Sequence, residues 1–116
     1  MKVLGIDPGT VTMGYGVVEG QGDLMSLVDC GVLVSEARSP IGERLDYLYR
    51  ELLEIVRYHR PGAVAVEQPF VAKNARSALA IGRAQAVALL AATGQGIPTY
   101  EYTPTRIKQR VANYGA

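Results

Sequence analysis

The sequence has one cysteine, one histidine and one phenylalanine, and it lacks tryptophan. Because Cys30 has no second cysteine to pair with, the fold cannot depend on an internal disulfide or an oxidising compartment. No apolar run reaches the roughly 18 residues of a membrane-spanning helix, and the N-terminus lacks a signal peptide's apolar core. These absences predict a cytoplasmic protein that binds no membrane. Cys30 itself is expected to be a small buried side chain.

Acidic residues are scarce in the second half of the chain. The net charge is +1, yet residues 68–116 carry six bases and a single acid, Glu101, whereas residues 1–67 carry ten acids and six bases. A basic half is typical of proteins that bind polyanions, although charge alone favours a solvated basic face. With 48% hydrophobic and 20% charged residues, the composition excludes a disordered or collagen-like chain. The length predicts one domain, covering residues 1–116.

Short apolar runs separated by turn residues predict five strands and three helices. The first three strands, joined by short turns, form an antiparallel meander. The next element is an amphipathic helix with Ser39 as its N-cap and Pro40 at its first position, and Arg60-Pro61-Gly62 ends it. We expect its terminal His59 to interact with the last carbonyl groups. The predicted strands are 3–7, 13–19, 24–35, 63–67 and 97–102, and the predicted helices are 40–59, 74–92 and a last one from Thr103 onward.

This order of elements predicts an α/β fold. A meander followed by helix–strand units forms a mixed five-stranded sheet with helices on both faces, which is the RNase H-like order. The helix over residues 74–92 has almost no polar face, so it must be covered on more than one side. Ala78, Gly82 and Ala86 recur there at four-residue intervals. We expect a second copy of the chain to pack against this helix.

Two acids end apolar strands and are the candidate metal ligands. Asp7 follows an apolar run and precedes Pro8-Gly9, and Glu67 is the last residue of Ala-Val-Ala-Val-Glu. Side chains alternate along a strand, so parallel neighbouring strands would bring both carboxylates together at their carboxyl ends. Oxygen ligands without histidine or cysteine nearby suit Mg²⁺, with Mn²⁺ as an alternative. The simpler alternative is that each acid ends its strand and points into solvent.

Three stretches together resemble the RuvC-type Holliday junction resolvases, which are crossover junction endodeoxyribonucleases. They are GIDPGT…GYGVV, VEQPFVAKNARSALAIGRAQAVALL and YEYTPTRIKQ. The resemblance implies an RNase H-like homodimer that cleaves symmetric strands of four-way junction DNA during recombination and repair. It further implies two Mg²⁺ ions per subunit in the full-length protein, and a branch-migration helicase as partner.

The resemblance also implies roles for single residues. Asp7 and Glu67 match the family's first and second metal ligands and are therefore catalytic. Phe70 matches an aromatic residue that inserts at the junction centre. Lys108 matches a basic residue that family members hold near the scissile phosphate, and it is therefore expected to be catalytic and to bind DNA. Three further residues at the start of the 74–92 helix are expected to bind DNA, namely Lys73, Asn74 and Arg76.

Family members continue beyond the position of Ala116, into a segment with two further metal ligands. Glu101, the late acid of this chain, matches neither of them. The resemblance therefore predicts a C-terminally truncated nuclease domain with a half-built metal site and weak or absent activity. Two alternative functions remain open from the sequence. One is a non-catalytic dimeric fragment that binds junction DNA. The other is a YqgF-like RNA-processing nuclease, which shares the first motif but lacks the Gln-Pro-Phe and Lys-Asn segment.

Overall fold

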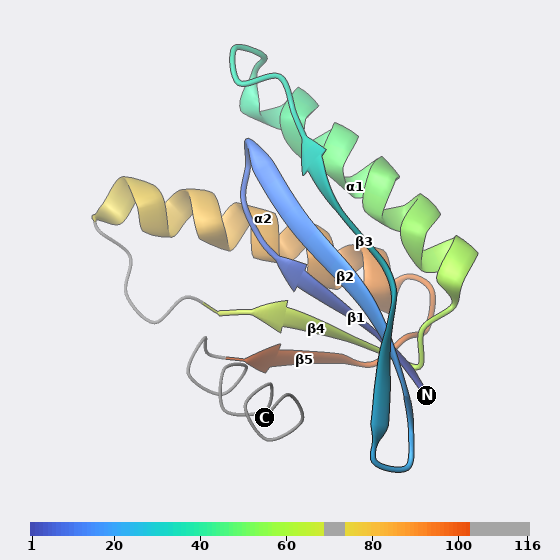
Figure 1. The fold of residues 1–116 in the computed structure, drawn as a ribbon. Helices are drawn as coiled ribbons and strands as arrows, with labels where there is room; N and C mark the ends of the chain where they lie inside the picture. The colour runs from blue at the N-terminus through green and yellow to red at the C-terminus, as the bar shows by residue number, and fades with distance from the viewer. Residues whose placement is uncertain (69–73, 103–116) are drawn as a thin grey trace.

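A computed structural model describes residues 1–68 and 74–102, which form one mixed sheet and two helices (Figure 1). The strand order is β3-β2-β1-β4-β5, in which β1, β2 and β3 form the antiparallel meander. Both β4 and β5 run parallel to β1. This topology confirms the predicted mixed sheet. The elements are β1 (Lys2–Asp7), β2 (Thr12–Gln21), β3 (Leu24–Val34), α1 (Ile41–His59), β4 (Ala63–Glu67), α2 (Ala75–Thr93) and β5 (Thr99–Tyr102).

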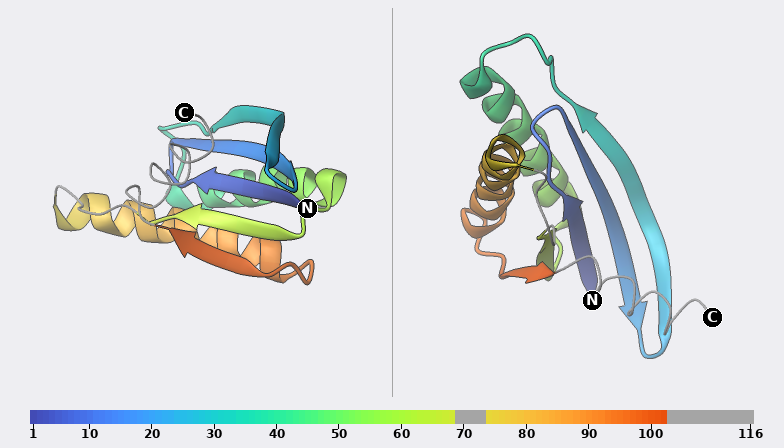
Figure 2. Two further views of the ribbon diagram at one scale, coloured as in Figure 1. Left: turned by 60° about the horizontal axis from the view of Figure 1, so that its bottom comes forward. Right: turned by 90° about the vertical axis from the view of Figure 1, so that its left-hand side faces the viewer.

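Both helices cover the same face of the sheet, as the end-on view shows (Figure 2). Alternation along the strands sends every second side chain into this layer, where it meets the apolar stripe of each helix. The opposite face carries no helix from residues 1–68 and 74–102. The predicted helix from Thr103 onward lies outside the described residues, so helices on both faces stay a prediction. The shared core consists chiefly of Leu4, Ile6, Met13, Val17, Val64 and Val66 of the sheet, Leu48, Leu52 and Val56 of α1, and Ala84, Val87, Ala88 and Ala91 of α2.

The start of α1 differs from the prediction by one residue. The helix begins at Ile41, Pro40 occupies the cap position, and no side chain caps the helix. Pro40 has an extended backbone with ψ of 148°, which leaves Ser39 one residue outside the helix. The prediction of Ser39 as N-cap was therefore wrong. The C-terminal end is as expected: Arg60 adopts a left-handed conformation and its N–H donates to the carbonyl of Val56 at 2.9 Å.

His59 and Cys30 also differ from the predictions. The buried His59 side chain lies with Nε2 2.9 Å from Oδ2 of Asp29, so it joins α1 to β3 rather than contacting the helix carbonyls. Asp29 faces the helix layer, and the next residue, Cys30, therefore faces the uncovered side and is exposed. A strand residue is buried only where another layer covers its face, and the described residues supply no such layer over Cys30.

Helix α2 has one buried face and one exposed face in the single chain. Ala84, Val87 and Ala88 pack into the core, whereas Ala78, Gly82 and Ala86 are exposed. Leu79 and Leu90 are 55% and 63% exposed. The described residues of one chain therefore cover α2 on one side only. No helix within residues 1–68 and 74–102 is both long and apolar enough to cross a membrane.

Candidate active site

The carboxyl ends of β1 and β4 place two acidic residues side by side. The parallel register pairs Leu4 with Val64 and Ile6 with Val66, so the next step along each strand brings Asp7 level with Glu67. The four apolar residues point into the core beneath the helices. Alternation then directs Asp7 and Glu67 to the opposite face, which neither of the described helices covers. The structure thus brings the two predicted ligands to adjacent strand ends on one face.

Small residues surround Asp7 on this face. Gly14 of β2 is its cross-strand partner, and a Cβ atom placed on Gly14 would lie 3.6 Å from the Cβ of Asp7. Gly5 and Ala65, one step back on the same face, are register partners on β1 and β4. No bulky side chain from these positions rises over Asp7, which is exposed. Among the described residues, these positions therefore leave room for a ligand as large as a DNA strand to approach the carboxylate.

The donor set fits a hard divalent cation. Two carboxylates on neighbouring strand ends repel each other unless a cation lies between them. Among the described residues, the Asp7 carboxylate has no hydrogen-bond or ion-pair partner. Oxygen ligands alone suit Mg²⁺ or Mn²⁺. The described residues contain no cluster of three or more His, Cys, Asp or Glu side chains, and residues 103–116 contain none of these four types. The chain as printed therefore offers this site two carboxylates.

Glu101 and Tyr15 lie on the other side of the sheet. Glu101 pairs with Val66 and Tyr15 with Ile6, and both partners face the helix layer. Glu101 is thus directed away from Asp7, in agreement with its exclusion from the predicted site. Burial raises the pKa of the Tyr15 hydroxyl above its ordinary value, and nearby Asp29 and Cys30 add to this shift. Neither side chain belongs to the carboxylate pair.

The turn after Asp7 is held by residues that the sequence analysis missed. The Ser35 hydroxyl donates to the carbonyl of Thr10 at 2.6 Å, and the Ser35 N–H donates to the carbonyl of Val11 at 2.8 Å. The guanidinium of Arg44 reaches the Thr10 hydroxyl at 3.5 Å. These partners lie far apart in the chain, so no local sequence pattern predicts their contacts. The one available signal was Ser35 itself, a polar residue that follows an apolar strand.

The predicted DNA-binding residues are only partly described. Phe70, Lys73 and Lys108 lie outside the described residues, so their roles stay predictions. Asn74 is the N-cap of α2, where its Oδ1 accepts the N–H of Ser77 at 2.9 Å. Arg76 is exposed in the first turn of α2, the part of this helix that projects beyond the end of β4 (Figure 1). The side-chain oxygen of Asn74 therefore has a structural role, whether or not its amide also contacts DNA.

Comparison with known proteins decides the family. A sequence model of the family described as crossover junction endodeoxyribonuclease RuvC matches residues 3–116. The chain belongs to the RuvC family. It is 51% identical over 115 residues to a RuvC of Dehalococcoides mccartyi, an alignment that covers 99% of this chain and 69% of that protein. A RuvC of Chloroflexus aggregans is 52% identical over 115 residues, with 99% and 70% covered.

Solved structures support the same conclusion. RuvC of Thermus thermophilus in complex with a Holliday junction substrate matches with a TM-score of 0.91 and 36% identity, covering all of this chain and 71% of that one. The yeast mitochondrial resolvase Ydc2 matches with a TM-score of 0.64 at 14% identity, covering 96% of this chain and 56% of that one. This second likeness shows the fold alone. The RuvC chain therefore has the predicted α/β, RNase H-like fold.

Proposed function

We propose that this RuvC chain is the nuclease domain of an endonuclease that resolves Holliday junctions by metal-dependent hydrolysis of DNA phosphodiesters. The observation that carries the proposal is the position of Asp7 and Glu67, each one residue beyond the last register pair of β1 and β4, Ile6 and Val66, on the sheet face that no described helix covers. The family match over residues 3–116 supports the DNA junction as substrate. It disfavours the YqgF-like RNA-processing alternative and a purely non-catalytic binding module.

In the proposed mechanism, Asp7 and Glu67 hold divalent metal, with Mg²⁺ as the physiological ion and Mn²⁺ as a substitute. Bound metal supplies Lewis-acid stabilisation of the phosphate and lowers the pKa of an attacking water. The resemblance to the family implies two ions in the full-length protein, and Asp7 and Glu67 are the residues of this chain that would help to hold them. Lys108 contacts the scissile phosphate and balances its negative charge. The small residues beside Asp7 leave room for the strand to lie across both carboxylates.

DNA contacts are proposed to come from the basic second half of the chain. Lys73, Asn74 and Arg76 lie at or just before the start of α2, whose N-terminal end carries a partial positive charge that attracts phosphate. Each phosphate neutralised by Lys or Arg releases counterions, so the affinity falls as salt is raised. We propose that Phe70 stacks on bases at the centre of the junction, where they are less fully paired than in linear duplex.

Phe70→Ala is the test of junction recognition. Loss of one base-stacking contact is worth about 1–3 kcal/mol, so we expect the preference for a four-way junction over linear duplex to fall roughly tenfold. Competition binding at fixed salt measures this ratio. Tyr58→Ala is the matched control, because Tyr58 is 83% exposed near the far end of α1. Equal losses on duplex and junction for Phe70→Ala would contradict a role in junction recognition.

The exposed strip of α2 is proposed to pack against a second copy of the chain. It consists of Ala78, Gly82 and Ala86, at successive turns, with Leu79 and Leu90 beside it. A Cβ atom on Gly82 would meet no atom within 4 Å, so the strip is open to close approach by another backbone. A two-fold dimer would present two equivalent sites to two like strands of one junction.

Ala86→Glu is expected to weaken this dimer. The substitution buries a carboxylate without a partner in the contact, which raises the dissociation constant by an order of magnitude or more. Sedimentation velocity over a concentration series measures the change, and Ala37→Glu, at an exposed turn position, is the control. A wild-type chain that stays monomeric at about 10⁻⁵ M would contradict the proposed interface.

From the family resemblance we further propose that the protein works in the cytoplasm, together with the helicase that drives branch migration. The test is co-purification of the helicase with the assembled RuvC–junction complex.

A further inference from the structure

The position of Asp7 depends on the turn that follows it. Asp7 is the last residue of β1, and its ladder partner is Gly14 on the β2 side. The register with β4 ends one residue earlier, at Ile6 and Val66. A strand terminus paired on one side is less constrained than its interior. The turn from Pro8 to Val11 therefore supplies much of the constraint on the carboxylate.

Ser35, the residue that follows β3, holds this turn in place through two hydrogen bonds. Its hydroxyl donates to the Thr10 carbonyl at 2.6 Å, and the contact is buried. Its main-chain N–H donates to the Val11 carbonyl at 2.8 Å. Ser35 and Thr10 are 5% and 8% exposed, so water cannot replace these bonds freely. A buried carbonyl left without a hydrogen bond here would destabilise the fold, because it would lose its hydration without gaining a partner.

The turn is also tight at Gly9. A Cβ atom placed on Gly9 would lie 2.1 Å from the main-chain oxygen of Thr12. That distance is far inside van der Waals contact, so only glycine fits this backbone. The turn thus has little room to adopt another conformation while the bonds from Ser35 are in place.

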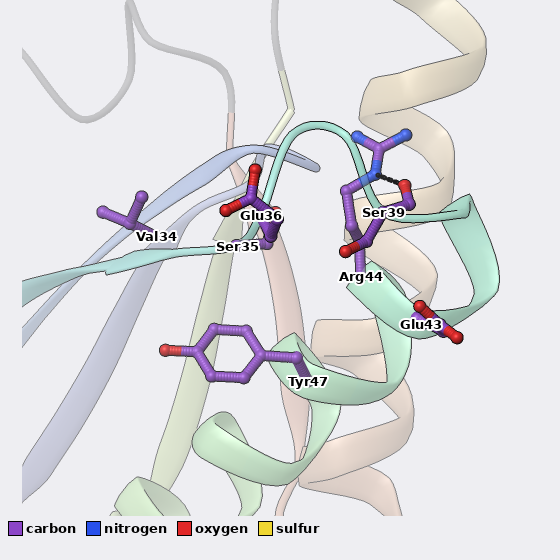
Figure 3. Close-up of a pocket in the computed structure, with 7 residues that line it drawn as sticks. All are labelled: Val34, Ser35, Glu36, Ser39, Glu43, Arg44 and Tyr47. Carbon is purple, nitrogen blue, oxygen red and sulfur yellow. Dashed lines mark hydrogen bonds between the residues drawn. The ribbon is translucent and has the colours of Figure 1, made fainter.

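Arg44 of α1 adds a second, weaker constraint. Its Nε donates to the Ser39 carbonyl at 3.1 Å (Figure 3), and its Nη1 lies 3.5 Å from the Thr10 hydroxyl. The second distance is at the long end for a hydrogen bond. Arg44 and Ser35 both line an open pocket of about 400 Å³ between the end of β3 and the start of α1. Ser35 is therefore the main constraint on the turn, and Arg44 supports it.

We infer that Ser35, assisted by Arg44, is a positioning residue for Asp7: it holds the turn after β1 so that the carboxylate stays level with Glu67. The inference rests on the proposed function, because it assigns Ser35 a role in metal binding at the Asp7–Glu67 site. Residues behind metal ligands commonly change metal affinity by about 10–100-fold when they are replaced. Ser35 acts through Asp7 and does not itself touch the metal or the DNA.

The test is a Mg²⁺ titration of the folded chain, followed by the amide chemical shifts of Asp7 and Glu67. Ser35→Ala removes the hydroxyl and keeps the main-chain N–H bond to Val11. We expect the apparent Mg²⁺ dissociation constant to rise about tenfold. Amide hydrogen exchange at Leu4 and Val64 reports whether the core stays intact in the same sample.

Three further variants separate positioning from general stability. Ser26→Ala makes the same change at an exposed position of β3 and should leave Mg²⁺ affinity unchanged. Ser35→Thr keeps a hydroxyl that can donate to the Thr10 carbonyl, so its Mg²⁺ affinity should stay within about twofold of wild type. Arg44→Gln loosens the turn from the helix side and should weaken Mg²⁺ binding by a smaller factor, about threefold. It also serves as the test if Ser35→Ala fails to fold.

The outcomes distinguish this inference from the proposed function. A wild-type chain whose Mg²⁺ binding does not depend on Asp7 would overturn both. Asp7-dependent binding in the wild type that stays unchanged in folded Ser35→Ala and in Arg44→Gln would overturn the inference alone. Weaker binding with an intact core, restored by Ser35→Thr, supports it.

Discussion

Replacing Asp7 by asparagine is expected to slow junction cleavage by at least about 10³-fold while leaving junction affinity within about twofold. The substitution removes one negative charge and one metal-binding oxygen from the pair formed with Glu67. Metal at the scissile phosphate contributes several kcal/mol of transition-state stabilisation, and each 1.36 kcal/mol is a factor of ten in rate. Phosphate contacts are proposed to come from other residues, so binding should persist.

This comparison is best made in a protein with measurable activity. The chain spans 69% of the length of its Dehalococcoides mccartyi relative, so a fusion that adds the remaining C-terminal part of that relative supplies a family-length protein. Asp23→Asn is the matched control, because Asp23 is exposed at the β2–β3 turn. Single-turnover cleavage and equilibrium binding are measured on the same four-way junction. Parallel loss of binding and cleavage in Asp7→Asn would instead indicate a structural role for Asp7.

The 116-residue chain by itself is expected to bind Mg²⁺ weakly and to cleave at least about 10³-fold more slowly than the fusion. Mg²⁺ requires six ligands in near-octahedral order at about 2.0–2.1 Å. Asp7 and Glu67 supply at most four oxygens, and water must complete the shell. Two carboxylates cannot neutralise the four positive charges of two ions about 3.5–4 Å apart. The 116-residue chain should therefore fail to hold a second ion.

Isothermal titration with Mg²⁺ and Mn²⁺ measures this difference. One weak site is expected for the 116-residue chain, and tighter binding with a second ion for the fusion. Asp7→Asn should abolish binding to the 116-residue chain, since a single carboxylate then remains. Two tightly bound ions in the 116-residue chain would contradict the account of the ligand set.

The sequence predicted the parts of the site that depend on local pattern. The apolar runs that end in Asp7 and Glu67 gave both strands, and side-chain alternation placed both acids on one face. The apolar stripe of α1 likewise predicted that helix, which ends where Arg60 and Pro61 interrupt it. These features follow from periods of two and 3.6 residues, which are readable within one element.

The features that the sequence analysis missed depend on contacts between distant residues. Ser35 and Thr10 are separated by 25 residues in the chain, and His59 and Asp29 by 30. No local pattern specifies such pairs, because they form only when the sheet and α1 are packed together. The exposure of Cys30 has the same origin, since alternation assigns a face to each side chain but does not say which face a helix covers.

The most direct test of the carboxylate pair is cleavage of a labelled four-way junction in four parallel reactions. They contain the fusion and the 116-residue chain, each as wild type and as Asp7→Asn, at matched Mg²⁺ and equal bound fraction of junction. The account predicts cutting by the wild-type fusion, its loss in the Asp7→Asn fusion, and little or no cutting by either form of the 116-residue chain. Unchanged cutting by the Asp7→Asn fusion would contradict the role of Asp7, and strong Asp7-dependent cutting by the 116-residue chain would show that its two carboxylates suffice.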